Sequence, residues 1–289
     1  MNRFQNRIIS PTLRFMHHAL RIIFLFQQSV FIRVHPWFKL FLLMFLPGSF
    51  CISVMAVPIT FQSSETQTSL LELYTSEGCS SCPPAETCLT RLKESPGLWK
   101  DFVPVAFHVD YWDYLGWRDP WASKPFSDRQ RAYAKQWRSD SVYTPGFVLN
   151  GKEWRAWSIQ KDGPKSAGVK AGVLTVSSSD TNRWQVSFAP ANTGAAYTVH
   201  AALLAGSLIS EVKAGENRGR SLPHDFVALT LVEAALVLHG EAAHGEFVLN
   251  AQRNGAEHDL GLAVWITPAG HFEPLQATGG WLARRGSVR

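Results

Sequence analysis

Apolar runs of strand length alternate with helix-compatible segments in the first half of the chain. Residues 70–74 and 102–109 are short, nearly continuous apolar runs, which is typical of strands buried in a parallel sheet. Residues 83–95 and 126–137 have the pattern of helices: the first opens with two prolines, and Ser127 can cap the second. Strand, helix and strand in this order predict a right-handed βαβ unit, with the carboxyl ends of both strands at one edge of the sheet.

The segment after the second predicted helix has the pattern of a hairpin. Beyond it, the hydrophobic pattern changes from strands and helices to short strands alone. Thr144-Pro145 precedes an apolar stretch that ends at an Asn-Gly turn, and residues 153–157 would form the return strand. Residues 160–170 are polar and resemble a linker. From residue 171 onward, turn residues separate short alternating segments at 173–177, 184–188, 199–204, 208–213, 226–238, 246–249 and 262–267. This pattern of short strands and turns predicts an all-β domain of the sandwich type.

An apolar run near the start of the chain has the pattern of an export signal. Lys39 precedes the apolar run 40–46, a Pro-Gly pair breaks the run, and small residues ending at Ala56 suit cleavage. An uncleaved membrane anchor is the alternative, because the apolar stretch is long enough to cross a bilayer. We therefore expect residues 1–56 to be a leader and residues 57–67 a flexible tail. The protein would then be periplasmic or secreted, or else anchored to the inner membrane.

The positive charge of the chain is concentrated in that leader. The 289 residues carry a formal net charge of +5, with 28 Lys and Arg against 23 Asp and Glu. Residues 1–56 contain six of the basic residues and none of the acidic ones, so the remainder carries 22 against 23. Without the leader there is no excess of basic residues, and we expect no nucleic-acid partner.

Cys79 and Cys82 lie between the first predicted strand and the first predicted helix. A Cys-x-x-Cys at this point of a βαβ unit is the layout of a thioredoxin-type redox site. A cysteine at a helix N-terminus faces unpaired N–H groups and the positive end of the dipole, which favour the nucleophilic thiolate. We expect Cys79 to be the more exposed sulfur and the nucleophile, and Cys82 to resolve the mixed disulfide. Ser80 and Ser81 could donate hydrogen bonds to the thiolate.

Two other interpretations of the cysteine pair stay open. The cysteines could form a purely structural disulfide, because thiols outside the cytoplasm tend to be oxidised. They could instead bind a metal: two ligands are too few for structural zinc, but copper(I) needs fewer, and His108 could join them. We expect no cofactor, with copper as the alternative. Cys88 lies on another face of the helix, which predicts a structural thiol.

Polar side chains at the end of the second strand should come out beside the cysteines. His108 could move a proton or stabilise a thiolate, or it could be a hydrogen-bonded core histidine. Asp110 could act as a base for Cys82, or it could cap the loop. Glu86 is expected to stabilise the first helical turn through the dipole.

The segment after Asp110 is strongly aromatic. It could line a groove for an apolar substrate or form the core of a lid, and its candidate side chains are Tyr111, Trp112, Tyr114, Trp117 and Trp121. The Glu-Asn-Arg-Gly turn at 216–219 and the His224-Asp225 pair could face a partner, or they could be turn chemistry within the β domain.

Longer runs of the sequence resemble a known family. ELYTSEGCSSCPPAE, FHVDYWDYLGWRDPWAS, RQRAYA and VYTPGFVLNG are similar to the secreted, thioredoxin-like family named domain of unknown function 1223, as are the later runs GENRGR and HDFV. The resemblance covers most of residues 68–280 and implies a thioredoxin-like fold but no settled substrate. It also implies that Pro145 is a cis-proline facing the Cys-x-x-Cys and that Thr144 pairs with the substrate backbone. Residues 152–168 depart from the family, because a Gly-Pro pair interrupts the last helix.

Together, these observations predict an α/β thioredoxin-like domain at residues 68–168, followed by an all-β sandwich-like domain at residues 169–289. We expect an exported thiol–disulfide oxidoreductase that acts on thiols or disulfides of other exported proteins through Cys79 and Cys82. One alternative is a copper-binding or copper-delivery module that uses the two cysteines and His108. Another is a non-catalytic binding module with a structural disulfide.

Overall fold

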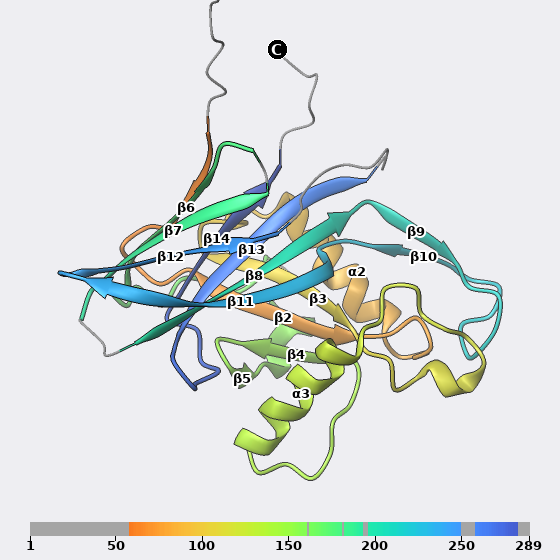
Figure 1. Cartoon of the computed structure of the whole chain (residues 1–289). Helices are drawn as coiled ribbons and strands as arrows, with labels where there is room; N and C mark the ends of the chain where they lie inside the picture. Colours follow the sequence, from red (N-terminus) through yellow and green to blue (C-terminus); the bar gives the residue numbers. More distant parts are fainter. Residues whose placement is uncertain (1–57, 161, 181, 193–195, 250–257, 283–289) are drawn as a thin grey trace, which may run out of the picture. The chain divides into compact units, whose positions relative to one another are not determined.

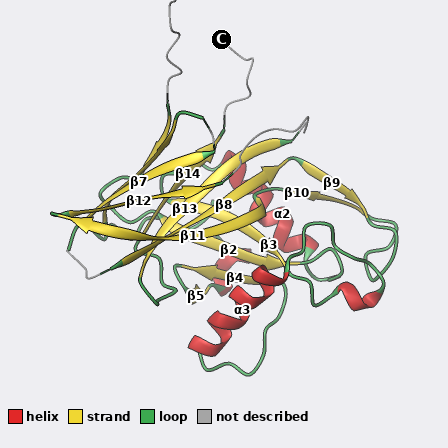
Figure 2. Ribbon diagram, in the orientation of Figure 1, coloured by secondary structure: helices red, strands yellow, loops and turns green. Residues whose placement is uncertain are grey.

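Strands dominate the part of the chain that the structure describes (Figure 2). The structure is a computed structural model, and it describes residues 58–160, 162–180, 182–192, 196–249 and 258–282. The predicted leader, with its cleavage site and its possible anchor, lies outside these residues. Within them, no helix has the length and apolar character needed to cross a membrane.

The described elements are short helices and fourteen strands (Figure 1). The helices are α2 (Pro83–Arg91), η3 (Leu92–Glu94), η4 (Asp113–Leu115), α3 (Lys124–Gln136) and η5 (Arg155–Ser158). The first seven strands are β1 (Ile59–Gln62), β2 (Ser69–Thr75), β3 (Phe102–His108), β4 (Gly146–Leu149), β5 (Lys152–Glu153), β6 (Gly172–Ser178) and β7 (Arg183–Pro190). The others are β8 (Tyr197–Gly206), β9 (Leu208–Glu211), β10 (Ser221–His224), β11 (Val227–His239), β12 (Ala242–Val248), β13 (Asp259–Pro268) and β14 (Gln276–Trp281).

The predicted fold class is wrong, because strands from both predicted domains belong to one twelve-stranded mixed sheet. Its main path is β1-β6-β7-β12-β11-β3-β2-β4-β5; β8 also pairs with β11, β13 with β8, and β14 with β13. Strand β11 connects the strands of the two predicted domains. Val227 at its start pairs in parallel with Ala106 of β3, its middle pairs with β8, and its end pairs with β12. The described chain is therefore not an α/β thioredoxin-like domain followed by a separate all-β sandwich.

Local predictions fared better than the global one. β2, α2 and β3 form the expected unit with parallel strands, and β4 and β5 form a hairpin around the Asn-Gly turn. The return strand is only two residues long, because the chain continues into η5. Strand β1, which pairs with β6, lies within the range expected to be a flexible tail.

Strands β8 and β13 have a hydrophobic core on each face. Ala202 and Leu204 of β8 pack with β2, β3, α2 and α3, whereas Ala201 and Leu203 pack with the strands β6, β7 and β12. β13 divides in the same way, since Trp265 belongs to the first core and its neighbour Val264 to the second. Successive side chains of a strand point to opposite faces, so one strand can serve both cores.

Helix α3 is fixed to the sheet by a buried ion pair. Arg129 Nε donates to Glu72 Oε1 of β2 at 2.7 Å, and both side chains are almost completely buried. Tyr133 on the next turn of α3 donates to Glu72 Oε2 at 2.6 Å. The Arg129 guanidinium also lies over the ring of Trp265, 5.1 Å from its centroid, which connects α3 to β13.

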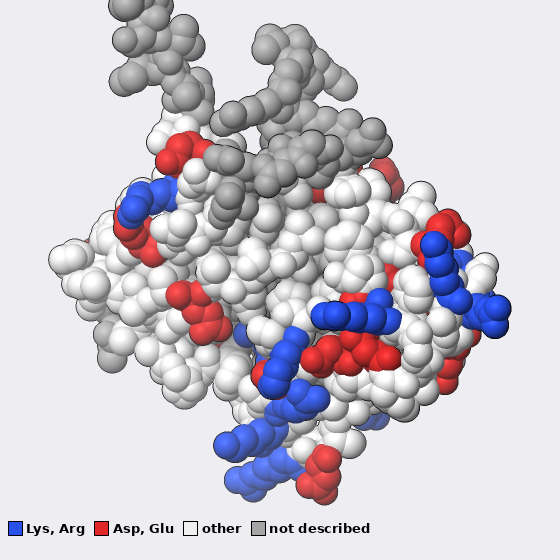
Figure 3. Space-filling view, turned by 45° about the vertical axis from the view of Figure 1, so that its right-hand side comes forward, with Lys and Arg blue, Asp and Glu red and all other residues white. Residues whose placement is uncertain are grey.

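Charged side chains of both signs are mixed on the face shown in Figure 3. Lys and Arg lie next to Asp and Glu over the lower part of this face, and broad uncharged areas lie between the charged groups.

Candidate functional site

The site lies at the sheet edge where β2 and β3 end. The register pairs Thr75 with His108 at the ends of these strands, and Tyr74 with Gly146 at the start of β4. The loops that follow β2 and β3 and the loop that precedes β4 therefore meet at this edge, as the sequence predicts.

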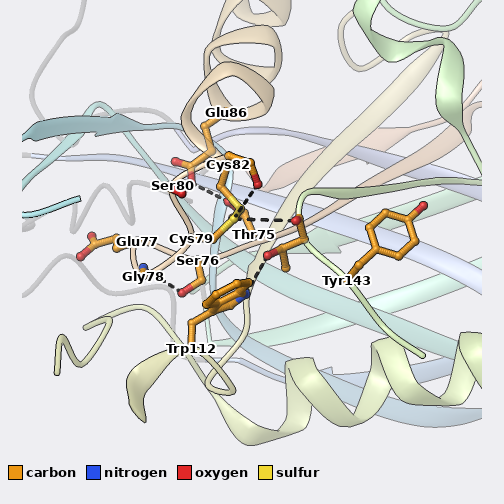
Figure 4. Close-up of a disulfide and its surroundings, with 12 residues drawn as sticks. Thr75, Ser76, Glu77, Gly78, Cys79, Ser80, Cys82, Glu86, Trp112 and Tyr143 are labelled. Atoms are coloured by element: carbon orange, nitrogen blue, oxygen red, sulfur yellow. Dashed lines mark hydrogen bonds between the residues drawn. A yellow bond between two sulfur atoms is a disulfide. The ribbon is translucent and has the colours of Figure 1, made fainter. Parts of the chain in front are cut away.

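Cys79 and Cys82 form a disulfide in the loop between β2 and α2 (Figure 4). Cys82 is the N-cap residue of α2, and Pro83 occupies the first helical position, where its missing N–H costs no hydrogen bond. Across the loop, the carbonyl oxygen of Thr144 lies 3.7 Å from Cys79 Sγ. The Thr144–Pro145 peptide bond is cis, as the family resemblance implied.

Both sulfurs are buried, which corrects the expectation that Cys79 is the exposed one. The exposed fractions are 1% for Cys79 and 0% for Cys82. The loop between β9 and β10 covers the turn: the buried Asn217 donates through Nδ2 to the carbonyl oxygens of Glu77 at 2.8 Å and Cys79 at 2.9 Å. Glu216 Oε2 accepts a hydrogen bond from the Ser80 N–H at 3.0 Å. The sequence predicted either a partner-facing loop or a turn within the β domain here, because no local pattern indicates a contact across more than a hundred residues.

Trp112 covers the other side of the disulfide loop. Its Nε1 donates to Thr144 Oγ1 at 2.8 Å (Figure 4). A Cβ atom at Gly78 would lie 2.9 Å from Trp112 Cβ, so glycine is needed for this close approach. Trp112 is thus the predicted aromatic residue that the structure brings to the Thr144 side of the site.

The other predicted aromatic residues lie elsewhere or have structural partners. Tyr111 donates to Gln130, and Tyr114 is 78% exposed. Trp117 donates to Glu77 Oε2 at 2.6 Å, and Trp121 donates to a serine of β9. A pocket of about 480 Å³ lies beside the Thr144–Pro145 turn. Tyr74 of β2 and residues from α3 to η5 line it, with Tyr143 and Gly146 among them, and neither cysteine does.

Asp110 and His108 have different hydrogen-bond partners. Asp110 accepts a hydrogen bond from Ser127 Oγ at 2.5 Å, which fits the interpretation that Asp110 fixes the loop to the start of α3. His108 is completely buried, and its Nδ1 lies 2.7 Å from Asp119 Oδ2. Asp119 also accepts from the Glu77 N–H at 2.8 Å, so this histidine is connected to the loop that carries the disulfide.

Glu86 and His224 form a second buried pair next to His108, and the sequence did not predict it. Glu86 Oε1 accepts from Thr75 Oγ1 at 2.6 Å, and Glu86 Oε2 contacts His224 Nδ1 from the end of β10. Nε2 of the same imidazole lies 3.1 Å from Glu77 Oε1. The spacing of Glu86, four residues after Cys82, was the available signal, since it places both residues on one face of α2. The contribution of His224 had no local signal.

The histidines lower the pKa of two of these carboxyl groups, Glu86 and Asp119. Burial alone would raise the pKa of the Glu86 carboxyl, but the hydrogen bond and charge of His224 outweigh burial and hold this pKa below its usual value. The same balance, with His108 as the partner, lowers the pKa of Asp119. Burial disfavours the charged form of His224, yet Glu77 and Glu86 raise its pKa to about 10.

The geometry of possible metal ligands differs from the expected copper set. Among the described residues, Glu86, His108 and His224 form the group whose donor atoms lie within 4.8 Å of one another. Neither cysteine belongs to it, and the two cysteines are bonded to each other. Cys88 is a free thiol, half-buried, with Sγ 3.3 Å from the Trp157 carbonyl oxygen.

Comparison with solved structures shows the fold but no activity. The protein AGR_C_4864 from Agrobacterium tumefaciens matches with a TM-score of 0.52 and 22% identity, over 76% of this chain and 96% of that one. HBP35 of Porphyromonas gingivalis matches with a TM-score of 0.50 and 12% identity, over 76% of each chain. Comparison with curated proteins yields no match.

A family model supplies the classification. The model described as "Protein of unknown function (DUF1223)" matches residues 70–267. This range runs from the start of β2 to the end of β13 and includes the disulfide, the loops that cover it and the buried histidines. On this match, the chain belongs to the family of proteins of unknown function DUF1223.

Proposed function

We propose that the Cys79–Cys82 disulfide is redox-active and that the protein is an exported thiol–disulfide oxidoreductase. The observation that carries the proposal is the position of the disulfide: it closes the turn that leads into α2, with the Thr144 carbonyl oxygen 3.7 Å from Cys79 Sγ. A thiolate formed there would lie at the N-terminal end of α2, where the positive end of the helix dipole stabilises it.

The proposed reaction is exchange with a partner that carries two thiols. A partner thiolate attacks Cys79 Sγ, the bond to Cys82 breaks, and Cys82 leaves as a thiolate that takes up a proton. The second partner thiol then loses its proton, attacks the mixed disulfide and releases Cys79. The two partner thiols are oxidised to one disulfide, and the disulfide of this protein is reduced to two thiols. The reverse sequence reduces a partner disulfide.

Access to the sulfurs requires a change in the loop that covers them. Ser80 and Ser81 are exposed between the two buried cysteines, so a partner would approach over these serines. The hydrogen bonds from Asn217 and to Glu216 would have to open for Cys79 to be attacked. We therefore propose that binding of the partner displaces the β9–β10 loop.

The proposed compartment lies outside the cytoplasm. The apolar run and cleavage pattern in residues 39–56 support export, and a resting disulfide suits an oxidising compartment. The proposed partners are exported proteins with reactive thiols or disulfides.

The test is to trap the partner in the native compartment. A Cys82→Ala variant can form a mixed disulfide through Cys79 but cannot resolve it, so covalent complexes that are released by reductant should accumulate. A variant with both Cys79→Ser and Cys82→Ala is the matched control and should give none. Complexes of equal yield in both variants, or none in either, would contradict the proposal.

The burial of both sulfurs favours a second candidate function, a binding module in which the disulfide is a fixed cross-link. In that case neither variant would trap a partner, and reduction of the disulfide would require unfolding. Disulfides that cannot be reached in the folded state are resistant to reduction.

A further inference from the structure

Five buried titratable side chains surround one point behind the disulfide loop. They come from five different segments and are exposed by 7% or less: Glu77, Glu86, His108, Asp119 and His224. Glu77 precedes Cys79 by two residues and Glu86 follows Cys82 by four, so the cluster holds the disulfide loop from both sides.

The three carboxyl groups of this cluster have no lysine or arginine partner among the described residues. Their ion pairs are with His108 and His224. Buried charge is costly unless it is paired, and a cation bound beside these carboxyl groups would pair with them.

His108 is oriented with one ring nitrogen free for a ligand. Its Nδ1 pairs with Asp119 Oδ2 at 2.7 Å, so Nε2 is the remaining donor atom. Nε2 is completely buried and has no hydrogen-bond partner. A carboxylate on one nitrogen of a histidine and a metal on the other is the usual arrangement at protein metal sites.

Glu77 and His224 also contain buried atoms without a hydrogen bond. Glu77 Oε1 and His224 Nε2 lie 3.1 Å apart, but their contact lacks hydrogen-bond geometry. If His224 is protonated and shared between Glu77 and Glu86, its own ring nitrogens have partners, but Nε2 of His108 still has none. A metal ion would also give Nε2 of His108 a partner.

We propose that Glu86, His108 and His224 bind one divalent transition-metal ion, with Asp119 positioning His108. The donor atoms of the first three lie within 4.8 Å of one another, close to the span that one ion with bonds of about 2.0–2.2 Å can bridge. Two imidazoles and one carboxylate in a buried site are a ligand set that Zn²⁺ takes, with a water molecule or another small ligand in the fourth position. The site differs from the copper set considered above, since it contains no cysteine, and it does not depend on the proposed redox function.

The test is metal binding by the full chain. After treatment with a chelator, and with folding checked by circular dichroism, the chain should bind one equivalent of Zn²⁺ in a calorimetric titration. Co²⁺ should give the visible absorption of a tetrahedral site. His108→Gln and Glu86→Gln should each abolish this spectrum, and Asp119→Asn should weaken binding by about 10-fold to 100-fold.

Matched controls separate this site from other donors. His200→Gln changes another buried histidine, which is bonded to Glu233 and Thr267, and should bind Zn²⁺ as the wild type does. A chain with both Cys79→Ser and Cys82→Ser should also retain binding. If the folded wild-type chain binds neither ion, the proposal is wrong, whatever the variants do. Binding that survives in His108→Gln and Glu86→Gln, or that is lost with the cysteines, would also overturn it.

Discussion

Glu86 shows how one residue can change the interpretation of a motif. From the sequence it reads as a helix-stabilising acid, but its carboxylate turns inward to Thr75 and His224 instead of facing solvent. It lies one helical turn after Cys82, on the same face of α2. The disulfide therefore lies next to a buried carboxylate that is paired with an imidazole.

The free thiol of Cys88 gives a residue-scale prediction of pH dependence. Burial raises its pKa, with Arg91 opposing the effect, so at a given pH a smaller fraction of Cys88 is thiolate in the folded than in the unfolded chain. Cys88 should be alkylated by iodoacetamide more slowly in the native than in the urea-unfolded chain, and the difference should shrink as the pH rises further. Peptide mapping by mass spectrometry measures both rates. Equal rates near neutral pH would contradict the prediction.

At the scale of elements, the β9–β10 hairpin covers the disulfide through one buried amide. Asn217 is completely buried and pairs with two loop carbonyls, whereas its neighbour Arg218 is exposed. The β9–β10 loop is thus the element whose position most directly controls access of a partner to the disulfide.

Removing that amide should loosen the cover. Asn217→Ala leaves buried carbonyls without a donor, which costs about 1–3 kcal/mol of unfolding free energy. Reduction of the disulfide by dithiothreitol should also become faster in the native protein. Arg218→Ala should change neither quantity. A normal reduction rate in a destabilised Asn217→Ala chain would show that this loop does not control access.

Helix α3 gives a second prediction at this scale. Arg129→Met removes one partner of a buried ion pair and leaves Glu72 charged in the core, so the free energy of unfolding should fall by about 3–5 kcal/mol. Arg131→Met is the matched control, because Arg131 forms an exposed pair with Asp128, and it should leave the free energy of unfolding almost unchanged. Urea denaturation followed by tryptophan fluorescence measures both. A similar loss in the two variants would contradict the assigned role of the pair.

At the scale of the whole described chain, one twelve-stranded sheet with a large core on each face of β8 and β13 replaces two separate domains. The local pattern around the cysteines and the hairpin could be predicted because it depends on neighbouring residues. The pairing of β3 with β11 could not, because its partners lie more than a hundred residues apart and no local pattern encodes them. One signal was overlooked: the continuous apolar runs of β8 and β13 indicate strands buried on both faces, unlike the alternating strands of an exposed sandwich.

The shared core predicts that residues 68–168 do not fold alone. In that fragment β3 would lose its partner β11, and the first core would lose Leu204, Phe226 and Trp265. The fragment should lack a cooperative thermal transition by circular dichroism, whereas the full chain should show one. A cooperative transition in the fragment would restore the two-domain description.

The central claim is that the Cys79–Cys82 disulfide reacts in the folded protein, and its redox equilibrium tests this most directly. The full chain is equilibrated in glutathione buffers of graded potential, and in dithiothreitol buffers for the most reducing points. Reduced Cys79 and Cys82 are quantified by alkylation while circular dichroism checks the fold. The account predicts native-state reduction with a potential between about −270 and −120 mV, the range of thiol–disulfide oxidoreductases. A potential below about −300 mV, or reduction only after unfolding, would identify a structural cross-link and contradict the account.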